Sequence, residues 1–368
     1  MDKNLEIVQK RITQLADEIN YHNYLYHVLD KPTIPDEVYD DLMKELRRLE
    51  NQYPQFKSST SPTQKVGGGA LDGFKKIKHQ KKMLSLDDVK TKEDFLSWST
   101  RIEKLTKEKN IANNKKTQYY CEYKFDGLSM SLLYENGEFL YGATRGDGEI
   151  GEDVSENLKT IRTIPLKFFN EEKIKQNLKN NNFGHLADRV TSKIQNKIEI
   201  RGEVIIDQKE FKRINDLQIK NNLPVYANPR NLAAGSIRQL DPNVTRTRNL
   251  IFNSYDIITD LGQQTHSEAH AILEALGFRA GKQTNKLCAD VNEVFNFYDN
   301  VSQNRSKLGF EIDGIVVQVD DIQTFKNLGV IGKGPRAGIA FKFPPIEGVT
   351  KVLDIQMQVG RTGVLTPV

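Results

Sequence analysis

The sequence has few residues that form covalent or metal cross-links, and it has no long apolar segment. Only two of its 368 residues are cysteines, Cys121 and Cys288, which is too few for a disulfide framework or a cysteine-rich zinc cluster. No apolar run approaches the roughly 20 residues of a membrane-spanning helix. The first residues also lack the apolar core of a secretory signal. We therefore expect a protein of the cytoplasm without membrane contact.

Neither sign of charge dominates the sequence. It contains 53 basic and 49 acidic residues, a net charge of +4, which allows an anionic partner without requiring one. Hydrophobic residues make up 38% and charged residues 28%, which is usual for a soluble globular protein. The length suffices for two or three domains, each with its own core.

The first 52 residues have the apolar periodicity of two amphipathic helices. Apolar residues recur at alternating spacings of three and four in residues 3–29, and a second helix is expected from Pro35 to Gln52. Asp36, Tyr39 and Asp40 share one face of its first turn. The two carboxylates also suit the positive end of the helix dipole, so a structural role is the alternative to a binding role.

Loop-forming residues then separate this hairpin from the rest of the chain. Residues 58–73 contain a Ser/Thr/Pro cluster followed by three consecutive glycines, so we place a domain boundary at their end. The helical hairpin is too small to be very stable alone. We expect it to dock on the domain that follows.

The stretch CEYKFDG, residues 121–127, contains the best candidate for a nucleophile. The amine of Lys124 attacks only when it is unprotonated, so it needs a neighbour that disfavours or accepts its proton. Asp126 could be that neighbour if the strand kinks at Gly127. The alternative is an exposed Lys–Asp pair at the start of a β-hairpin.

Strand and helix periodicities alternate through the remainder. Strands are expected at residues 118–124, 128–132, 139–143, 198–206, 250–258, 311–319 and 339–344, with strand character again at 352–368. Helices are expected at residues 209–221, 266–276 and 291–304. Residues 170–197 are rich in Asn, Lys and Gln, which predicts a solvated excursion that is helical in part at most.

Side-chain alternation assigns faces within these strands. Lys342 lies opposite Phe341 and Phe343, so it faces whatever the other side of its strand encloses. Glu203 lies on the polar face of strand 198–206, together with Glu199. From periodicity alone, that face is expected to be solvated.

Two further stretches have the composition of anion-binding sites. Residues 144–148 (TRGDG) form a glycine-rich turn with Arg145 at its mouth, and such a turn lets backbone amides approach an anion. Arg230 and Arg238 lie among small residues, which allows a phosphate chain to come close to both guanidinium groups.

The order of these features resembles the nucleotidyltransferase domain shared by polynucleotide ligases and capping enzymes. Longer stretches narrow the resemblance to the NAD-dependent bacterial DNA ligases, and it spans essentially the whole chain. These stretches are residues 26–27 (YH), 34–40 (IPDEVYD), 61–64 (SPTQ), 83–86 (MLSL), 144–148 (TRGDG), 200–204 (IRGEV), 228–231 (NPRN), 235–236 (GS) and 359–363 (VGRTG).

The resemblance implies an α+β fragment. Residues 1–73 would form a helical domain that binds the nicotinamide mononucleotide (NMN) half of NAD. Residues 74–350 would form an antiparallel-sheet nucleotidyltransferase domain of the ATP-grasp-like ligase type, and residues 351–368 the start of a truncated OB domain. The zinc, helix-hairpin-helix and BRCT modules of the family are not included, so self-adenylation by a monomer is the expected activity, without nick sealing.

The resemblance also implies a role for each candidate residue. Lys124 would attack the adenylyl phosphorus of NAD, form lysyl-AMP and release NMN, assisted by Asp126, Asp313 and Lys342. The matching NAD-binding positions are Tyr26, His27, Asp36, Glu37, Val38, Tyr39 and Asp40 for the nicotinamide half, and Ser85, Leu86, Glu122, Arg145, Glu203, Tyr255, Gln318 and Lys342 for the adenylate, with Tyr255 stacked on adenine.

Other partners follow from the same resemblance. Mg²⁺ would help to neutralise the phosphates, although the sequence offers no protein metal site. In the full-length family members, AMP passes to the 5′-phosphate of nicked duplex DNA, with Arg230 and Arg238 as phosphate contacts.

Two departures from the family pattern stand out. Gln318 occupies a position at which the family's Asp-Gly strand usually carries a lysine facing the nucleotide, and residues 170–197 are longer than the usual connection. Two alternatives therefore stay open: an ATP-dependent ligase or capping enzyme, and a catalytically impaired nucleotide- or DNA-binding module. The hairpin residues argue against the first, and Lys124 with its retained partners argues against the second.

Overall fold

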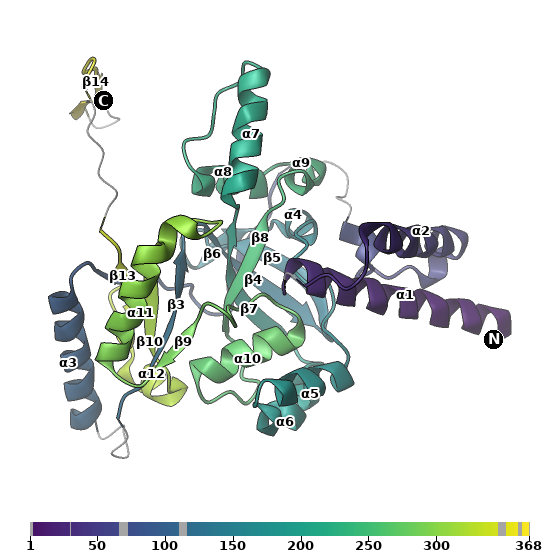
Figure 1. The fold of residues 1–368 in the computed structure, drawn as a ribbon, viewed down its shortest axis with the longest axis horizontal. Helices are drawn as coiled ribbons and strands as arrows, with labels where there is room; N and C mark the ends of the chain where they lie inside the picture. Colours follow the sequence, from purple (N-terminus) through teal and green to yellow (C-terminus); the bar gives the residue numbers. More distant parts are fainter. Residues whose placement is uncertain are drawn as a thin grey trace.

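The computed structural model describes residues 3–29, 31–65, 73–109, 116–344, 351–359 and 363–367. Two larger β-sheets lie side by side, helices cover their outer faces, and a helical hairpin is attached at one side (Figure 1). Within the described residues, no helix combines the length and apolarity needed to cross a membrane.

The N-terminal hairpin consists of α1 (Lys3–His27) and α2 (Asp36–Gln52), which confirms both predicted helices. It has its own small core, made by residues of both helices: Ile12, Leu15, Ile19, Leu46 and Leu49. Two short 3₁₀ turns follow, η1 (Pro54–Phe56) and η2 (Pro62–Lys65). The glycine-rich part of the expected linker, residues 66–72, lies outside the described residues.

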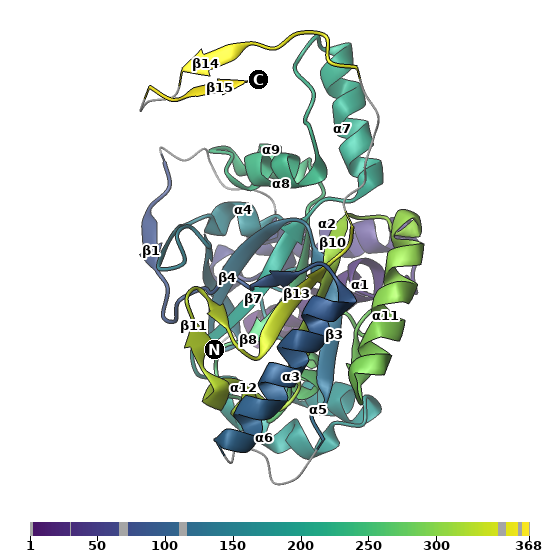
Figure 2. The same ribbon diagram turned by 90° about the vertical axis from the view of Figure 1, so that its left-hand side faces the viewer.

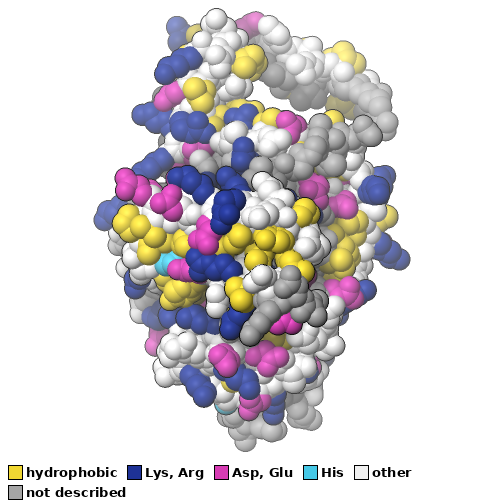
Figure 3. Space-filling model, turned by 90° about the vertical axis from the view of Figure 1, so that its right-hand side faces the viewer, with side chains coloured by type: hydrophobic (Ala, Val, Ile, Leu, Met, Phe, Trp, Pro, Cys, Tyr) yellow, Lys and Arg dark blue, Asp and Glu magenta, His cyan; other side chains and the backbone are white. Residues whose placement is uncertain are grey.

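The hairpin docks on the neighbouring domain through a few contacts. The ring of Tyr24 meets that of Phe169 edge-on at 5.1 Å between centroids, and the ammonium group of Lys173 lies 4.5 Å from the ring centroid of Tyr21. The surface on the hairpin side mixes basic, acidic and apolar side chains without segregating one kind (Figure 3). This docking agrees with the expectation for a small helical unit.

The first large sheet has the strand order β2-β13-β10-β3-β9. Its strands are β2 (Asp88–Val89), β13 (Gly338–Lys342), β10 (Ile312–Val319), β3 (Tyr119–Phe125) and β9 (Lys286–Cys288). Neighbours are antiparallel except β2 and β13. Helices α3 (Lys92–Glu108), which the periodicity did not reveal, and α11 (Val291–Asn304) cover one face (Figures 1 and 2).

The alternation predicted for this sheet is confirmed. Phe341 and Phe343 are buried in the core beneath α3 and α11, together with Ile315 and Val317 of β10. Lys342 therefore extends from the opposite face of the sheet, toward the second sheet.

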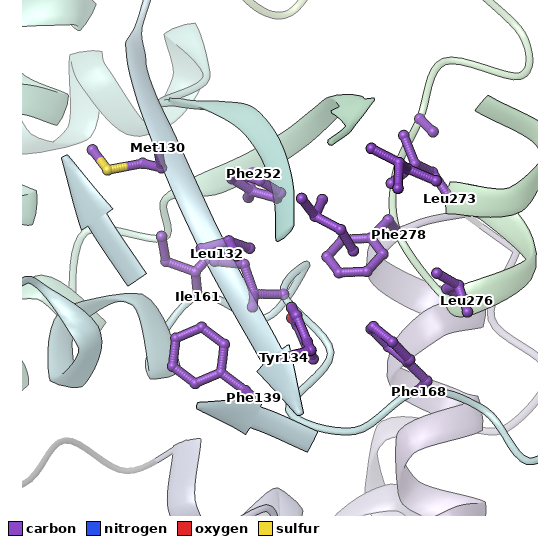
Figure 4. Close-up of a cluster of buried hydrophobic side chains, with 14 of the residues drawn as sticks. Met130, Leu132, Tyr134, Phe139, Ile161, Phe168, Phe252, Leu273, Leu276 and Phe278 are labelled. Atoms are coloured by element: carbon purple, nitrogen blue, oxygen red, sulfur yellow. The ribbon is translucent and has the colours of Figure 1, made fainter. Parts of the chain in front are cut away.

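The second sheet has the order β5-β4-β7-β8 and is antiparallel throughout. Its strands are β5 (Glu138–Thr144), β4 (Leu128–Glu135), β7 (Ile198–Ile205) and β8 (Ile251–Ile257). Helix α10 (His266–Leu276) packs over it and ends at Gly277, whose φ of 108° is left-handed. Figure 4 shows the apolar cluster formed there by Leu132, Tyr134, Phe252 and Phe278.

The prediction of a solvated excursion at residues 170–197 was wrong. The segment forms α5 (Glu171–Asn180), η3 (Gly184–Leu186) and α6 (Ala187–Lys193). About one apolar side chain per helical turn is buried in the core of the second sheet. These side chains are Ile174, Leu178, Leu186, Val190 and Ile194. These few suffice to anchor short helices, and the numerous Asn, Lys and Gln residues cover the outside.

Shorter elements complete the chain. They are β1 (Lys76–Lys78), β6 (Ile150–Glu152), α4 (Ser155–Lys159), α7 (Gln208–Lys220), α8 (Pro229–Ile237), α9 (Pro242–Arg246), η4 (Arg305–Lys307), α12 (Ile322–Leu328), β11 (Val330–Ile331), β12 (Gly334–Pro335), β14 (Met357–Val359) and β15 (Leu365–Pro367). The last two form an exposed hairpin, as the strand character of residues 352–368 predicted. Gly360, Arg361 and Thr362 of that hairpin lie outside the described residues.

The chain crosses from one sheet to the other at Gly127, between the ends of β3 and β4. A Cβ atom on Gly127 would collide with the carbonyl oxygen of Val204 in β7, which is backbone and cannot rotate away. The backbone at Gly127, just before β4, therefore lies against β7 at a distance that only a glycine permits.

We expect Gly127→Ala to lower the free energy of unfolding by about 1–3 kcal/mol, because overpacking against the β7 backbone forces the chain away from that strand. Gly309→Ala is the matched control, since no atom lies within 4 Å of its added Cβ, and its effect should stay within about 0.5 kcal/mol. Chemical denaturation of the two variants checks this. Equal stabilities would contradict the close approach at Gly127.

Candidate active site

A cleft of about 1340 Å³ opens between the two sheets. Side chains of β3, β10 and β13 line one wall, and side chains of β4, β7 and β8 line the other. Most of the candidate residues from the nucleotidyltransferase part of the chain line it: Ser85, Leu86, Glu122, Lys124, Arg145, Glu203, Arg230, Arg238, Tyr255, Gln318 and Lys342. The structure thus gathers side chains that are up to 257 residues apart, from Ser85 to Lys342, around one space.

Strand register brings the two lysines together. Lys124 of β3 and Lys342 of β13 both pair with Gly314 of β10. Residues paired across neighbouring strands share a face of the sheet, so both ammonium groups extend into the cleft. Gly314 has no side chain to separate them, and a Cβ there would collide with the carbonyl oxygen of Phe341.

Asp313 is the carboxylate next to Lys124. Lys124 Nζ lies 2.9 Å from Asp313 Oδ1 and donates to Oδ2 at 3.1 Å, while Lys342 Nζ is 3.8 Å from Oδ2. Simple alternation would turn Asp313 away from the cleft, but the β3–β10 pairing shifts register between Ile312 and Gly314. Such a bulge redirects a side chain.

The expectation that Asp126 is the proton-accepting neighbour of Lys124 is not met by this geometry. Asp126 accepts instead from Arg230, with 3.0 Å between Oδ1 and the guanidinium Nη1. The reason is tertiary: β10 brings Asp313 alongside Lys124, whereas α8 brings Arg230 over Asp126. Asp126 thus stays within the site, but as a partner of Arg230.

The glycine-rich turn at residues 145–148 has a fixed conformation. Gly146 and Gly148 have φ values of 55° and 96°, and the Gly148 amide donates to the Arg145 carbonyl at 2.9 Å. Asp147 accepts from the amides of Ile150 and Glu149 at 2.8 Å each, and these bonds lower the pKa of Asp147. The turn leaves the Arg145 side chain exposed at the cleft.

The polar face of β7 is covered, not solvated, so that expectation was wrong. Glu199 and Arg201 are buried, at 3% and 6% exposure. Arg201 donates to Glu199 at 2.8 Å and also to the carbonyl oxygens of Lys81 and Lys82. Arg201, whose role the sequence analysis did not identify, therefore fastens the segment that leads to Ser85 and Leu86 against the sheet.

Glu203 lies on the same covered face and accepts from the Ser129 hydroxyl at 2.7 Å. Burial raises the pKa of Glu203 to about 7, against the lowering effects of the Ser129 bond and of Lys124 and Arg230. The Tyr255 ring lines the same wall, and burial together with Glu203 raises its pKa. Glu203 can thus act as acceptor or donor near neutral pH.

The hairpin candidates form a second group that does not line the cleft. Tyr26, Asp36, Glu37, Val38 and Asp40 are exposed, and Tyr39 donates to Asn23 at 2.9 Å. Burial lowers the pKa of His27 to about 3, with Arg162 and Lys65 adding repulsion. The structure therefore gathers the candidates into two sites, one on the hairpin and one in the cleft.

Further basic side chains line the cleft beside Lys124 and Lys342. Arg238 pairs with Glu152 at 2.8 Å, and both line the cleft. Lys76, Lys81 and Lys82 line it as well. In the part of the chain that is described, no group of three or more His, Cys, Asp or Glu side chains could hold a metal ion.

Comparison with known proteins identifies both parts of the chain. The family model described as NAD-dependent DNA ligase adenylation domain matches residues 71–346. A second, described as DNA ligase-like, N-terminal NAD+-binding domain, matches residues 6–67.

Curated relatives extend this match along the chain. A DNA ligase of Thermosipho africanus (strain TCF52B) is 42% identical over 98% of this chain and 50% of its own length. One from Anoxybacillus flavithermus (strain DSM 21510 / WK1) is 41% identical over 98% of this chain and 49% of its own. The chain thus spans about half the length of the curated relatives it matches.

Solved structures are more distant. A mycobacterial DNA ligase D complexed with ATP and MES is 12% identical over 63% of this chain and 58% of its own, with a TM-score of 0.30, too low to support an inference. The two family models and the two relatives show that the chain belongs to the NAD-dependent DNA ligases, of which it carries the N-terminal NAD+-binding domain and the adenylation domain.

Proposed function

We propose that this chain performs the first step of NAD-dependent ligation, the transfer of AMP from NAD to Lys124. The Nζ–P bond forms, the bond from the adenylyl phosphorus to the bridging oxygen breaks, and NMN leaves with that oxygen. The observation that carries the proposal is the convergence of Lys124, Lys342 and Asp313 in the cleft of an adenylation domain.

The chemistry of this cluster supports the proposal. The attacking amine must lose a proton, and Asp313 is within 2.9 Å to accept it. Negative charge develops on the phosphate oxygens and on the leaving NMN. Lys342, and Arg145 at the glycine turn, would stabilise that charge.

The remaining cleft residues are proposed to hold the adenosine half. Glu203 and Arg145 would contact the ribose, while Ser85, Leu86, Glu122, Gln318 and Tyr255 would surround the base, with Tyr255 stacked on the ring. Two walls from different sheets, with an aromatic ring on one of them, suit a flat base.

Mg²⁺ is proposed as a companion of the NAD phosphates. The described side chains do not fit a resident, protein-held ion, because no group of three or more ligands converges. Mg²⁺ commonly binds through one or two carboxylates together with substrate phosphates, and it would supply charge neutralisation when bound.

In the whole ligases, we propose that AMP passes from the lysine to the 5′-phosphate of a nick and that the adjacent 3′-hydroxyl displaces it, during DNA replication and repair. Arg230 and Arg238 are exposed at the cleft and suited to the DNA phosphates. The present residues, about half of that length, are expected to self-adenylate as a cytoplasmic monomer without sealing nicks.

We expect the intact mass of the protein to rise by one AMP after incubation with NAD and Mg²⁺, and not with ATP. Lys124→Ala should abolish the gain, because it removes the nucleophile. Lys92→Ala is the matched control, since Lys92 also pairs with an aspartate, Asp299, at 2.7 Å but does not line the cleft. It should leave the gain intact.

The other outcomes discriminate between the alternatives. A gain with ATP alone would move the chain to the ATP-dependent ligases and capping enzymes, and would leave the hairpin residues without a role. No gain with either nucleotide would indicate a binding module. Gln318→Lys would then test whether the missing charge is the cause.

The hairpin is proposed to hold the nicotinamide half of NAD. Asp36 and Asp40 are exposed on its surface and lie outside the cleft. The proposal therefore requires the hairpin to leave its docked position and approach the cleft mouth when NAD binds.

We expect Asp36→Ala combined with Asp40→Ala to slow adenylation by NAD at least about tenfold, because two charged hydrogen-bond acceptors are lost. AMP binding to the cleft, measured by calorimetry, should not change. Asp41→Ala is the control on the same helix, since Asp41 pairs with Lys44 at 3.0 Å. Unchanged NAD kinetics in the double variant would contradict the assignment of the hairpin.

A further inference from the structure

A histidine that the proposed mechanism does not use lies behind the cleft. His270 of α10 and Glu122 of β3 have side chains that are 4% and 7% exposed, and His270 Nε2 lies 3.2 Å from Glu122 Oε2. The other carboxylate oxygen, Oε1, accepts from Gln318 Nε2 at 3.3 Å. Glu122 is thus held between an imidazole and an amide, and it lines the cleft.

The contacts of the imidazole determine its protons. His270 Nδ1 lies 2.8 Å from the carbonyl oxygen of Ala280, which can only accept, and 3.2 Å from Asn285 Nδ2, whose hydrogens also reach that carbonyl and the Tyr120 hydroxyl. The shorter contact, to the acceptor, places a hydrogen on Nδ1. A neutral ring would then direct the lone pair of Nε2 at a carboxylate. An imidazolium removes this conflict, because its Nε2 hydrogen then faces the Glu122 carboxylate and the pair is a cation beside an anion.

The surroundings favour the charged ring. Burial by itself lowers the pKa of His270, but Glu122, the Ala280 carbonyl and Glu274 raise it above its ordinary value. Asp256 of β8 also faces the ring, although burial raises its own pKa to about 6.

The groups around His270 do not add a second positive charge on α10 that would repel its imidazolium. Burial lowers the pKa of His266, one helical turn away, to about 3, so that ring is neutral. The phenol ring of Tyr120 packs against His270 at 4.7 Å between centroids, and its raised pKa keeps it uncharged. Arg201, the other cation here, is already paired with Glu199.

We propose that His270 is a positioning residue that keeps Glu122 an ionised acceptor at the inner end of the cleft and thereby sets selectivity for a 6-aminopurine base. The inference rests on the proposed binding of NAD in this cleft. It also gives a role to the glutamine at position 318: the positive charge that a lysine would supply on β10 comes from α10 instead.

The selectivity follows from donor and acceptor counts. An ionised carboxylate accepts hydrogen bonds and cannot donate them, so it suits the exocyclic amine of adenine. A 6-oxopurine would present a carbonyl oxygen to the same carboxylate. If His270 lost its Nε2 proton, a nitrogen lone pair would face the Glu122 carboxylate from behind. The attraction that fixes Glu122 in position would then be lost.

The test compares self-adenylation by NAD and by its 6-oxo analogue, nicotinamide hypoxanthine dinucleotide, from about pH 6 to about pH 9. For the wild type, KM for NAD should rise as pH passes upward through the pKa of His270, because the imidazolium is present below it and lost above it. His270→Leu should raise KM about tenfold with little change in kcat, and should reduce the preference over the analogue.

A rescue variant distinguishes the effect of the His270 charge from the effect of its packing. Gln318→Lys added to His270→Leu should restore KM and remove its rise with pH, because a lysine amine at Glu122 stays protonated over this range. His185→Leu is the matched control: it removes an exposed His–Glu pair of 2.9 Å that also involves α10, through Glu268, away from the cleft. It should change neither parameter.

Unchanged KM and selectivity in His270→Leu, a pH-independent KM in the wild type, or failure of the lysine to restore binding would each overturn the proposal. If His270→Leu does not fold, His270→Gln and the wild-type pH profile decide the question. If the wild type gains no AMP at all, the proposed function fails separately. Calorimetric binding of AMP against inosine monophosphate then tests His270 alone.

Discussion

The contact of two lysines with one aspartate depends on almost every other feature of this fold. Lys124, Lys342 and Asp313 come from three strands, and they meet because Gly314 leaves space between the lysines while the bulge in β10 turns Asp313 toward them. Two like charges this close need a carboxylate between them. The sheet register, the bulge and the glycine all serve this one arrangement.

Much of this arrangement could be predicted from local sequence patterns. Alternation placed Lys342 opposite Phe341, and the helical spacing gave α1, α2, α10 and α11 close to their observed bounds. The partner of Lys124 could not be predicted in this way, because Asp313 is 189 residues away and reaches it through a bulge that has no local signature. Sequence proximity favoured Asp126 instead.

The burial of polar residues was missed for a related reason. Glu199 and Arg201 alternate with apolar residues as they would on a solvated strand. Their partners are distant in sequence: the carbonyl oxygens of residues 81–82 accept from Arg201, and Ser131 donates to Glu199. In residues 170–197, likewise, one apolar side chain per helical turn is enough once a core is present to receive it. The composition of such a segment reflects its many exposed polar residues and hides the few apolar residues that are buried.

Among the residues that the structure describes, the buried apolar side chains form three clusters, one under each large sheet and one within the hairpin. The hairpin cluster is the smallest and makes few contacts with the rest of the protein, so we expect the hairpin to be the least stable part on heating. Unfolding need not be a single all-or-none event. Gentle warming would then unfold the hairpin, the part proposed to select NAD as donor, while the lysine cluster stays assembled. Selectivity for the donor would be lost at a lower temperature than the adenylation reaction itself.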